Sequence, residues 1–144
     1  MAENSPIIIK ETKEAPNLAL LKETFGVSED DVIIAYGNII YAPNKTMSRD
    51  LLVHELTHCN RQGMNERSAE RWWEKYMKDK DFRLKEEAIA YGEQYKYCCK
   101  VYKDKNRQTK ILHALAVDLA SERYGNIVSV SDAIMCITNP LRPS

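Results

Sequence analysis

Apolar and polar residues follow two patterns along the chain, a strand-like one near the N-terminus and a helical one after it. Residues 31–36 and 39–42 are apolar runs on either side of Gly37-Asn38, which predicts a tight β-hairpin. From residue 48 onward, apolar positions recur every three or four residues, which predicts helices. The expected helices cover residues 17–25, the stretch between Ser48 and Gly63, residues 66–78, 82–102 and 108–124, and a short segment from about residue 131.

These elements predict an α+β fold that is mostly helical with a small β-hairpin or sheet. The chain has 144 residues, of which 44% are hydrophobic and 29% charged, a composition typical of a soluble globular protein with one core. We expect a polar, flexible N-terminal arm over residues 1–15 and a single domain over residues 16–144.

Charge and cysteine content argue against several classes of protein. Lysine plus arginine equals aspartate plus glutamate at 21 each, so no overall field indicates a nucleic-acid or membrane partner. The N-terminus lacks a basic start followed by a long apolar run, which favours a cytoplasmic protein. The four cysteines are expected to be free thiols, because Cys98 and Cys99 are adjacent and no CxxC spacing recurs.

Candidate chemistry is concentrated in the His-Glu-Leu-Thr-His run at residues 54–58. Residues four apart lie on one face of a helix, so His54 and His58 can reach the same metal ion. Glu55 lies about 100° around the helix from His54, close enough to take a proton from a water molecule at the metal. The alternative is a helix with two ordinary histidines, but the motif in this context indicates a zinc helix.

A catalytic zinc usually has three protein ligands, and the candidates for the third are His113, Glu86 and Glu87. Helix phase separates the two glutamates, because apolar residues at helical spacing from Leu84 to Tyr102 mark the buried face of the long helix. At about 100° per residue, Glu87 falls about 60° from the centre of that face and Glu86 about 160° from it. We therefore expect Glu86 to point to water. Glu87 should point inward, where it binds a metal or pairs with an Arg or Lys.

With these residues, the chain resembles the gluzincins, in which HExxH is followed by a downstream glutamate on a second helix. More closely, it resembles small metallopeptidases encoded by phages and prophages. The similar segments are residues 54–62, 72–76, 81–84 and 87–91. The resemblance implies a zincin-like minimal metallopeptidase domain that holds one Zn²⁺ per chain. Such a domain would hydrolyse bonds in a peptide or protein substrate. The resemblance to phage proteins also allows an association with the virion. It implies that His54, His58 and Glu87 bind zinc and that Glu55 is the general base.

Peptide hydrolysis also requires a hydrogen-bond donor for the oxyanion, in addition to zinc. Tyr91 is the first choice, because it lies one turn beyond the glutamate ligand and gluzincins often use a Tyr or His in this role. Tyr95 and His113 are the alternatives. Tyr91 also has a structural interpretation as a core tyrosine, and His113 as a buried, hydrogen-bonded histidine. Asp118 and Glu122 are weaker candidates for orienting a zinc-bound imidazole.

Two further features have both a functional and a structural interpretation. The strand over residues 39–42 is either an edge strand that holds an extended substrate or a lid on the core. Trp72 and Trp73 are expected in the core rather than on a substrate platform. The alternatives to a general peptidase are a non-enzymatic, zinc-stabilised interaction or virion protein, and a regulatory protease with one partner substrate. Glu55 favours an enzyme, because a purely structural zinc site would not need it.

Overall fold

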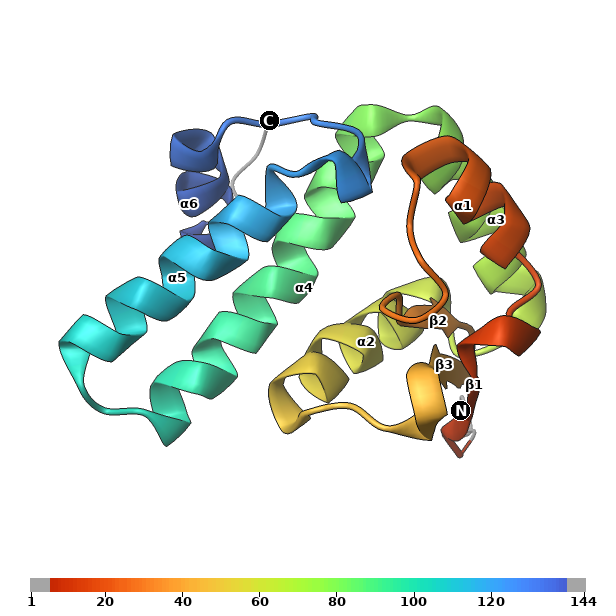
Figure 1. Cartoon of the computed structure of the whole chain (residues 1–144), viewed down its shortest axis with the longest axis horizontal. Helices are drawn as coiled ribbons and strands as arrows, with labels where there is room; N and C mark the ends of the chain where they lie inside the picture. Colours follow the sequence, from red (N-terminus) through yellow and green to blue (C-terminus); the bar gives the residue numbers. More distant parts are fainter. Residues whose placement is uncertain (1–5, 140–144) are drawn as a thin grey trace.

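The computed structural model describes residues 6–139, in which short β-strands near the N-terminus are followed by layered helices (Figure 1). The strands are β1 (Ile8–Glu11), β2 (Ile34–Tyr36) and β3 (Ile39–Ala42). The α-helices are α1 (Leu18–Phe25), α2 (Arg49–Gln62), α3 (Glu66–Lys78), α4 (Lys80–Val101), α5 (Lys105–Leu119) and α6 (Val130–Thr138). The 3-10 helices are η1 (Thr12–Glu14), η2 (Pro43–Lys45) and η3 (Glu122–Tyr124). The expected α+β class, mostly helical with a small sheet, is confirmed.

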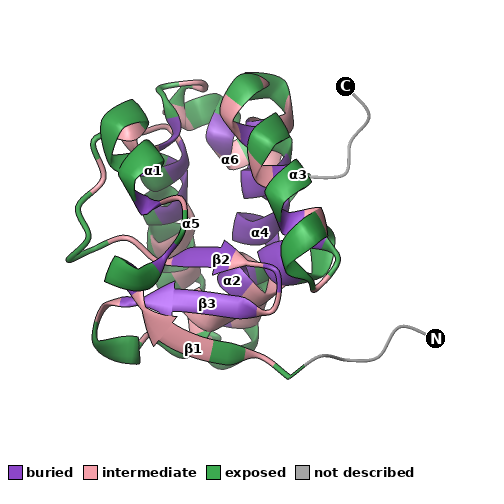
Figure 2. Ribbon diagram, turned by 90° about the vertical axis from the view of Figure 1, so that its right-hand side faces the viewer, coloured by how far each residue is buried: buried purple, intermediate pink, exposed green. Residues whose placement is uncertain are grey.

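The sheet has the strand order β1-β3-β2, so β3 lies in the middle and is buried along its length (Figure 2). β3 is parallel to β1 and antiparallel to β2, to which it is joined by a two-residue turn. Gly37 in this turn has a φ of 71°, and a Cβ atom there would lie 2.7 Å from the carbonyl carbon of Asn65. The turn therefore requires glycine, and the hairpin predicted around Gly37-Asn38 is present.

The N-terminal segment differs from the flexible arm expected over residues 1–15. β1 and η1 occupy residues 8–14, while residues 1–5 lie outside the described part of the chain. Ile9 packs against a cluster that contains the buried Ile40 and Cys59, which connects β1 to α2. β1 contains only two apolar residues, Ile8 and Ile9, followed by Lys10 and Glu11, so its sequence does not show the alternation typical of a strand.

β3 is not the edge strand expected to hold an extended substrate, because β1 and β2 pair with it on both sides. β2 is the sheet edge that contacts α2 and α3. The carbonyl oxygen of Ala35 in β2 accepts hydrogen bonds from Gln62 Nε2 at 3.0 Å and from Trp73 Nε1 at 2.9 Å. These bonds fix the sheet against the helices that bear the candidate site.

The ends of α2 and α4 follow the residues that cap them. α2 begins after Ser48 and ends at Gly63, as predicted, and Gly63 has a left-handed φ of 94°. α4 begins at Lys80, two residues earlier than expected. The reason is Asp79, whose side chain accepts hydrogen bonds from two backbone N–H groups of the first turn.

α5 is shorter than predicted, because it ends at Leu119 rather than near Tyr124. The carbonyl oxygen of Ser121 accepts backbone hydrogen bonds from Tyr124 at 3.2 Å and Asn126 at 3.2 Å, which closes a compact turn around η3. Gly125 completes the turn with a φ of 94°. Tyr124, at the end of η3, lies in the core.

α4 lies between two groups of helices, with α2 and α3 on one side and α5 and α6 on the other (Figure 1). The main core cluster consists of Trp72, Tyr76, Ala88, Tyr91, Leu115, Ala116, Leu119, Tyr124, Ala133 and Ile137. Trp72 thus lies in the core, as expected, and Trp73 is partly buried against it. Because α4 is covered on two sides, four of its polar residues are buried as well: Arg83, Glu86, Glu87 and Gln94. Among residues 6–139, no helix combines the length and the apolar character needed to cross a bilayer.

Candidate metal centre

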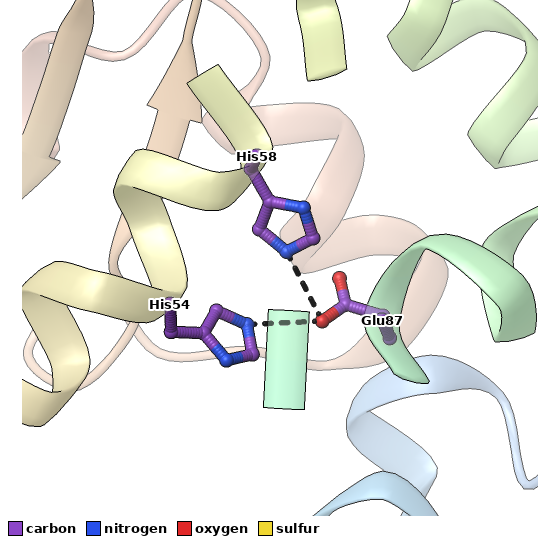
Figure 3. Close-up of side chains that lie close together, drawn as sticks. All are labelled: His54, His58 and Glu87. Carbon is purple, nitrogen blue, oxygen red and sulfur yellow. Dashed lines mark hydrogen bonds and ion pairs between the residues drawn. The ribbon is translucent and has the colours of Figure 1, made fainter. Parts of the chain in front are cut away.

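Three side chains expected to bind a metal meet between α2 and α4 (Figure 3). His54 and His58 lie one turn apart on α2, and Glu87 faces them from α4. The Nε2 atoms of His54 and His58 lie 3.1 and 3.2 Å from Oε1 of Glu87. All three residues are buried, and their candidate ligand atoms lie within 4.8 Å of one another. This group can hold a metal ion.

The hydrogen bonds around His54 determine which of its nitrogen atoms faces Glu87. The carboxylate of Asp50 accepts a 2.8 Å hydrogen bond from Nε2 of Gln94, so Gln94 turns its carbonyl oxygen towards His54. That oxygen lies 3.0 Å from Nδ1 of His54, which must carry the hydrogen. With the hydrogen on Nδ1, it is Nε2 that faces the Glu87 carboxylate, an arrangement in which this nitrogen could bind a cation shared with Glu87.

Glu87 is held in place through its second oxygen. The hydroxyl of Tyr76 donates a 2.7 Å hydrogen bond to Oε2, which leaves Oε1 facing the histidines. Burial alone would raise the pKa of the Glu87 carboxyl, but His58 and His54 hold this pKa well below its usual range. Glu87 is therefore ionised, and a buried anion of this kind matches the charge of a metal ion.

His58 is supported by packing rather than by a second hydrogen bond. Its Nδ1 atom is buried and has no hydrogen-bond partner in the part of the chain that the structure describes. Its ring meets the edge of Trp72, with 5.3 Å between the ring centroids. Metal-binding histidines usually donate their other N–H to a neighbour. His58 departs from that rule, although its Nε2 atom is still directed at the same point as His54.

A pocket of about 120 Å³ lies beside these three side chains, and Glu55 lines it. Glu55 follows His54 on α2 and is buried. Burial raises the pKa of its carboxyl to about 8, against the opposing effects of His54 and Arg123. The pocket can hold several water molecules but is smaller than the roughly 300–1,000 Å³ of typical ligand pockets. It therefore fits a small part of a substrate.

Tyr91, the expected oxyanion donor, lines the same pocket and packs its ring edge-on against His54 at a centroid distance of 4.4 Å. Its hydroxyl lies 2.8 Å from that of Tyr124, which also lines the pocket. Burial raises the pKa of both hydroxyls well above 10, so both keep their hydrogen. One hydrogen joins the two oxygens, and the pair retains a second O–H that can be donated.

The other candidates for the oxyanion donor, and for residues that orient a zinc-bound imidazole, differ in whether they line the pocket. Tyr95 is partly buried against the core and does not line the pocket. His113 is exposed, contrary to the expectation of a buried histidine, because α5 packs on α4 and α6 through one face only. Asp118 lines the pocket. Glu122 is exposed and does not line it.

Glu86 does not point to water, as helix phase predicts, but is buried with 2% exposure. Arg61 of α2 donates two hydrogen bonds to it, at 2.7 and 3.0 Å, and Trp72 Nε1 donates a third at 3.1 Å. The prediction is wrong because α2 and α3 also pack against α4, and their side chains cover Glu86 and donate hydrogen bonds to it. An ion pair with arginine is the alternative to metal binding for Glu87, but it is the adjacent Glu86 that forms such a pair, with Arg61.

Several residues around the centre are not evident from the sequence. Gln94 lies seven positions after Glu87 on α4, a helical spacing that offers a signal. Tyr76 has the spacing of a core residue, which gives no sign of its bond to Glu87. Tyr124 and Arg123 reach the pocket through the η3 turn, where the sequence pattern predicts a continuing helix.

The residues of the described chain thus form a buried group able to hold a metal ion, next to a pocket with an acidic side chain and two tyrosines. Comparison of the chain with protein-family models, with curated proteins and with solved structures finds no match.

Proposed function

We propose that this protein is a zinc-dependent metallopeptidase of the gluzincin type, with a zincin-like domain. The observation that carries the proposal is the convergence of His54, His58 and Glu87 beside a pocket lined by Glu55. Two imidazoles and one carboxylate are a donor set that zinc enzymes use, with a further position left for water or substrate. The resemblance of the HExxH region to small phage and prophage metallopeptidases supports the same assignment.

Each residue of the pocket has a chemical role in this proposal. Bound zinc would polarise a carbonyl group and lower the pKa of a bound water molecule to near neutrality. In its ionised form, which pH values above its pKa of about 8 or the charge of a nearby cation favour, Glu55 accepts the proton of the attacking water and returns it to the leaving amine. The Tyr91–Tyr124 pair donates its remaining O–H to the oxyanion. Asp50 and Gln94 keep His54 in the tautomer that presents Nε2.

A non-enzymatic zinc protein is the alternative from another class. In such a protein, zinc would only fix α2 against α4, and the pocket would be incidental. The position of Glu55 favours the enzyme, because it buries a carboxyl group next to the ligands at a cost that a structural site has no reason to carry.

We expect the zinc-loaded protein to cleave a mixture of short peptides, with the new termini identified by mass spectrometry. Treatment with 1,10-phenanthroline should stop cleavage, and added zinc should restore it, because the reaction requires the metal. A His58→Ala variant purified in the same way controls for a contaminating protease. Absence of cleavage, or cleavage that continues unchanged after chelation, would contradict the proposed function.

A further inference from the structure

Arg123 has no role in the chemistry proposed above, yet its side chain lines the pocket. Among the described residues, it is the only Lys or Arg that does so. Its guanidinium forms no ion pair within 4.0 Å in residues 6–139, although the carboxyl groups of Glu55 and Asp118 line the same pocket. A partly buried cation whose hydrogen-bonding neighbour is the neutral hydroxyl of Tyr124, and which forms no ion pair among the described residues, is available to an anionic ligand.

The η3 turn holds Arg123 at a defined place. Nε of Arg83 donates a 2.9 Å hydrogen bond to the carbonyl oxygen of Tyr124, the next residue in the chain. The hydroxyl of Tyr124 is in turn joined to that of Tyr91. Gly125 follows in the left-handed conformation that closes the turn. The guanidinium is therefore carried on a backbone that is fixed on two sides, as a binding residue requires.

The neighbours of Arg123 make this corner of the pocket rich in hydrogen-bond donors. The guanidinium offers several N–H groups in a planar fork, and the Tyr91–Tyr124 pair offers one O–H. Burial alone would lower the pKa of Arg123, but Tyr124, Tyr91 and Asp118 raise it, so the group is charged. Donors of this geometry match a carboxylate, which accepts two parallel N–H bonds.

We propose that Arg123 and Tyr124 bind a carboxylate group of the substrate, so that the preferred substrate is a short peptide with a carboxylate close to the bond that is cleaved. The carboxylate can be the C-terminus of the peptide or an Asp or Glu side chain. This inference rests on the proposed function. The small volume of the pocket, about 120 Å³, fits one such group beside the metal ligands.

A different role for Arg123 would be to balance the charge of Glu55, whose pKa it lowers. In that role the guanidinium would affect the rate of hydrolysis. It would not make ligands that carry a carboxylate bind more tightly than ligands that lack one. The affinity of small metal-binding ligands separates the two roles without relying on catalysis.

The test uses three hydroxamates, which bind zinc through the same group. In each, a malonyl hydroxamate is joined to alanine, to alaninamide, or to the amide of aspartic acid. The first carries a C-terminal carboxylate, the second none, and the third only a side-chain carboxylate. Dissociation constants are measured by titration calorimetry on the zinc-loaded parent and on Arg123→Gln, Arg123→Lys and Arg71→Gln. Arg71 is exposed on α3 and serves as the matched control.

We expect at least one carboxylate ligand to bind the parent about tenfold or more tightly than the alaninamide ligand, as expected for hydrogen bonds to charged groups. Arg123→Gln should abolish that difference, Arg123→Lys should keep part of it, and Arg71→Gln should keep all of it. The better of the two ligands identifies the source of the carboxylate. Equal binding of all three ligands to the parent, or a preference that survives Arg123→Gln, would overturn the inference alone. Failure of all three to bind would overturn the proposed function with it.

Discussion

Replacement of Glu55 by Gln should leave zinc bound and slow peptide hydrolysis by about 10²–10⁴-fold, the usual contribution of a general base. The amide has nearly the shape of the carboxylate, but it cannot accept a proton. Glu55 is buried and lines the pocket next to His54, so no other described residue occupies its position. Burial raises the pKa of Glu55 to about 8, so the protein already accommodates a neutral group at this position at neutral pH, and the fold should persist with the neutral amide.

Two measurements on the same protein check this prediction. Chelator competition gives the zinc affinity, which should match that of the parent, and the rate of peptide cleavage should fall. Glu93→Gln is the matched control, because Glu93 is an exposed glutamate on α4 that pairs only with Lys96 among the described residues. A Glu55→Gln variant that cleaves as fast as the parent would exclude Glu55 as the base, and one that has lost zinc would assign it to the metal site.

Replacement of Glu87 by Gln should weaken zinc binding by at least about a hundredfold, the upper end of what loss of an outer-shell partner costs. In the proposed zinc site, Glu87 is the anionic ligand, and its Oε1 lies 3.1 and 3.2 Å from the two histidine nitrogens. A neutral amide oxygen is a weaker ligand and does not balance the charge of the metal. Added zinc should therefore stabilise this variant against heat much less than it stabilises the parent.

The adjacent Glu86 provides a control of the same chemistry and the same burial. Glu86→Gln should keep the zinc affinity of the parent but lower the free energy of unfolding by about 1–3 kcal/mol, because its charged hydrogen bonds to Arg61 are lost. Zinc affinity by chelator competition and urea unfolding distinguish the two variants. If Glu86→Gln loses zinc while Glu87→Gln retains it, the assignment of the third ligand is wrong.

Helix spacing and helix phase, which can be read from the sequence alone, correctly bring His54, His58 and Glu87 together. Both rules are local, since residues one turn apart share a face whatever surrounds the helix. The same reasoning fails for Glu86, because exposure depends on what covers the other side of α4. For His113 the sequence predicts burial, but the side chain is exposed, because other helices cover only one face of α5.

The residues of the site that cannot be predicted from the sequence depend on contacts between segments far apart in the chain. Gln94 supports His54 across 40 residues of chain, and Arg83 supports Tyr124 across 41. The sequence pattern predicts a continuous helix over residues 108–124, whereas Arg123 and Tyr124, which line the pocket, belong to the separate η3 turn. β1 is a comparable case, since a short strand without alternation becomes visible only when β3 pairs with it.

The central claim is that His54, His58 and Glu87 bind one zinc ion and leave a position open. Diffraction at the zinc absorption edge, from crystals of freshly purified protein, tests it most directly. We predict a single anomalous peak about 2.0–2.2 Å from Nε2 of both histidines and from the Glu87 carboxylate, with no fourth protein ligand. A peak at another place in the molecule, a fourth side chain that closes the site, or no zinc in protein purified without chelator would contradict the claim.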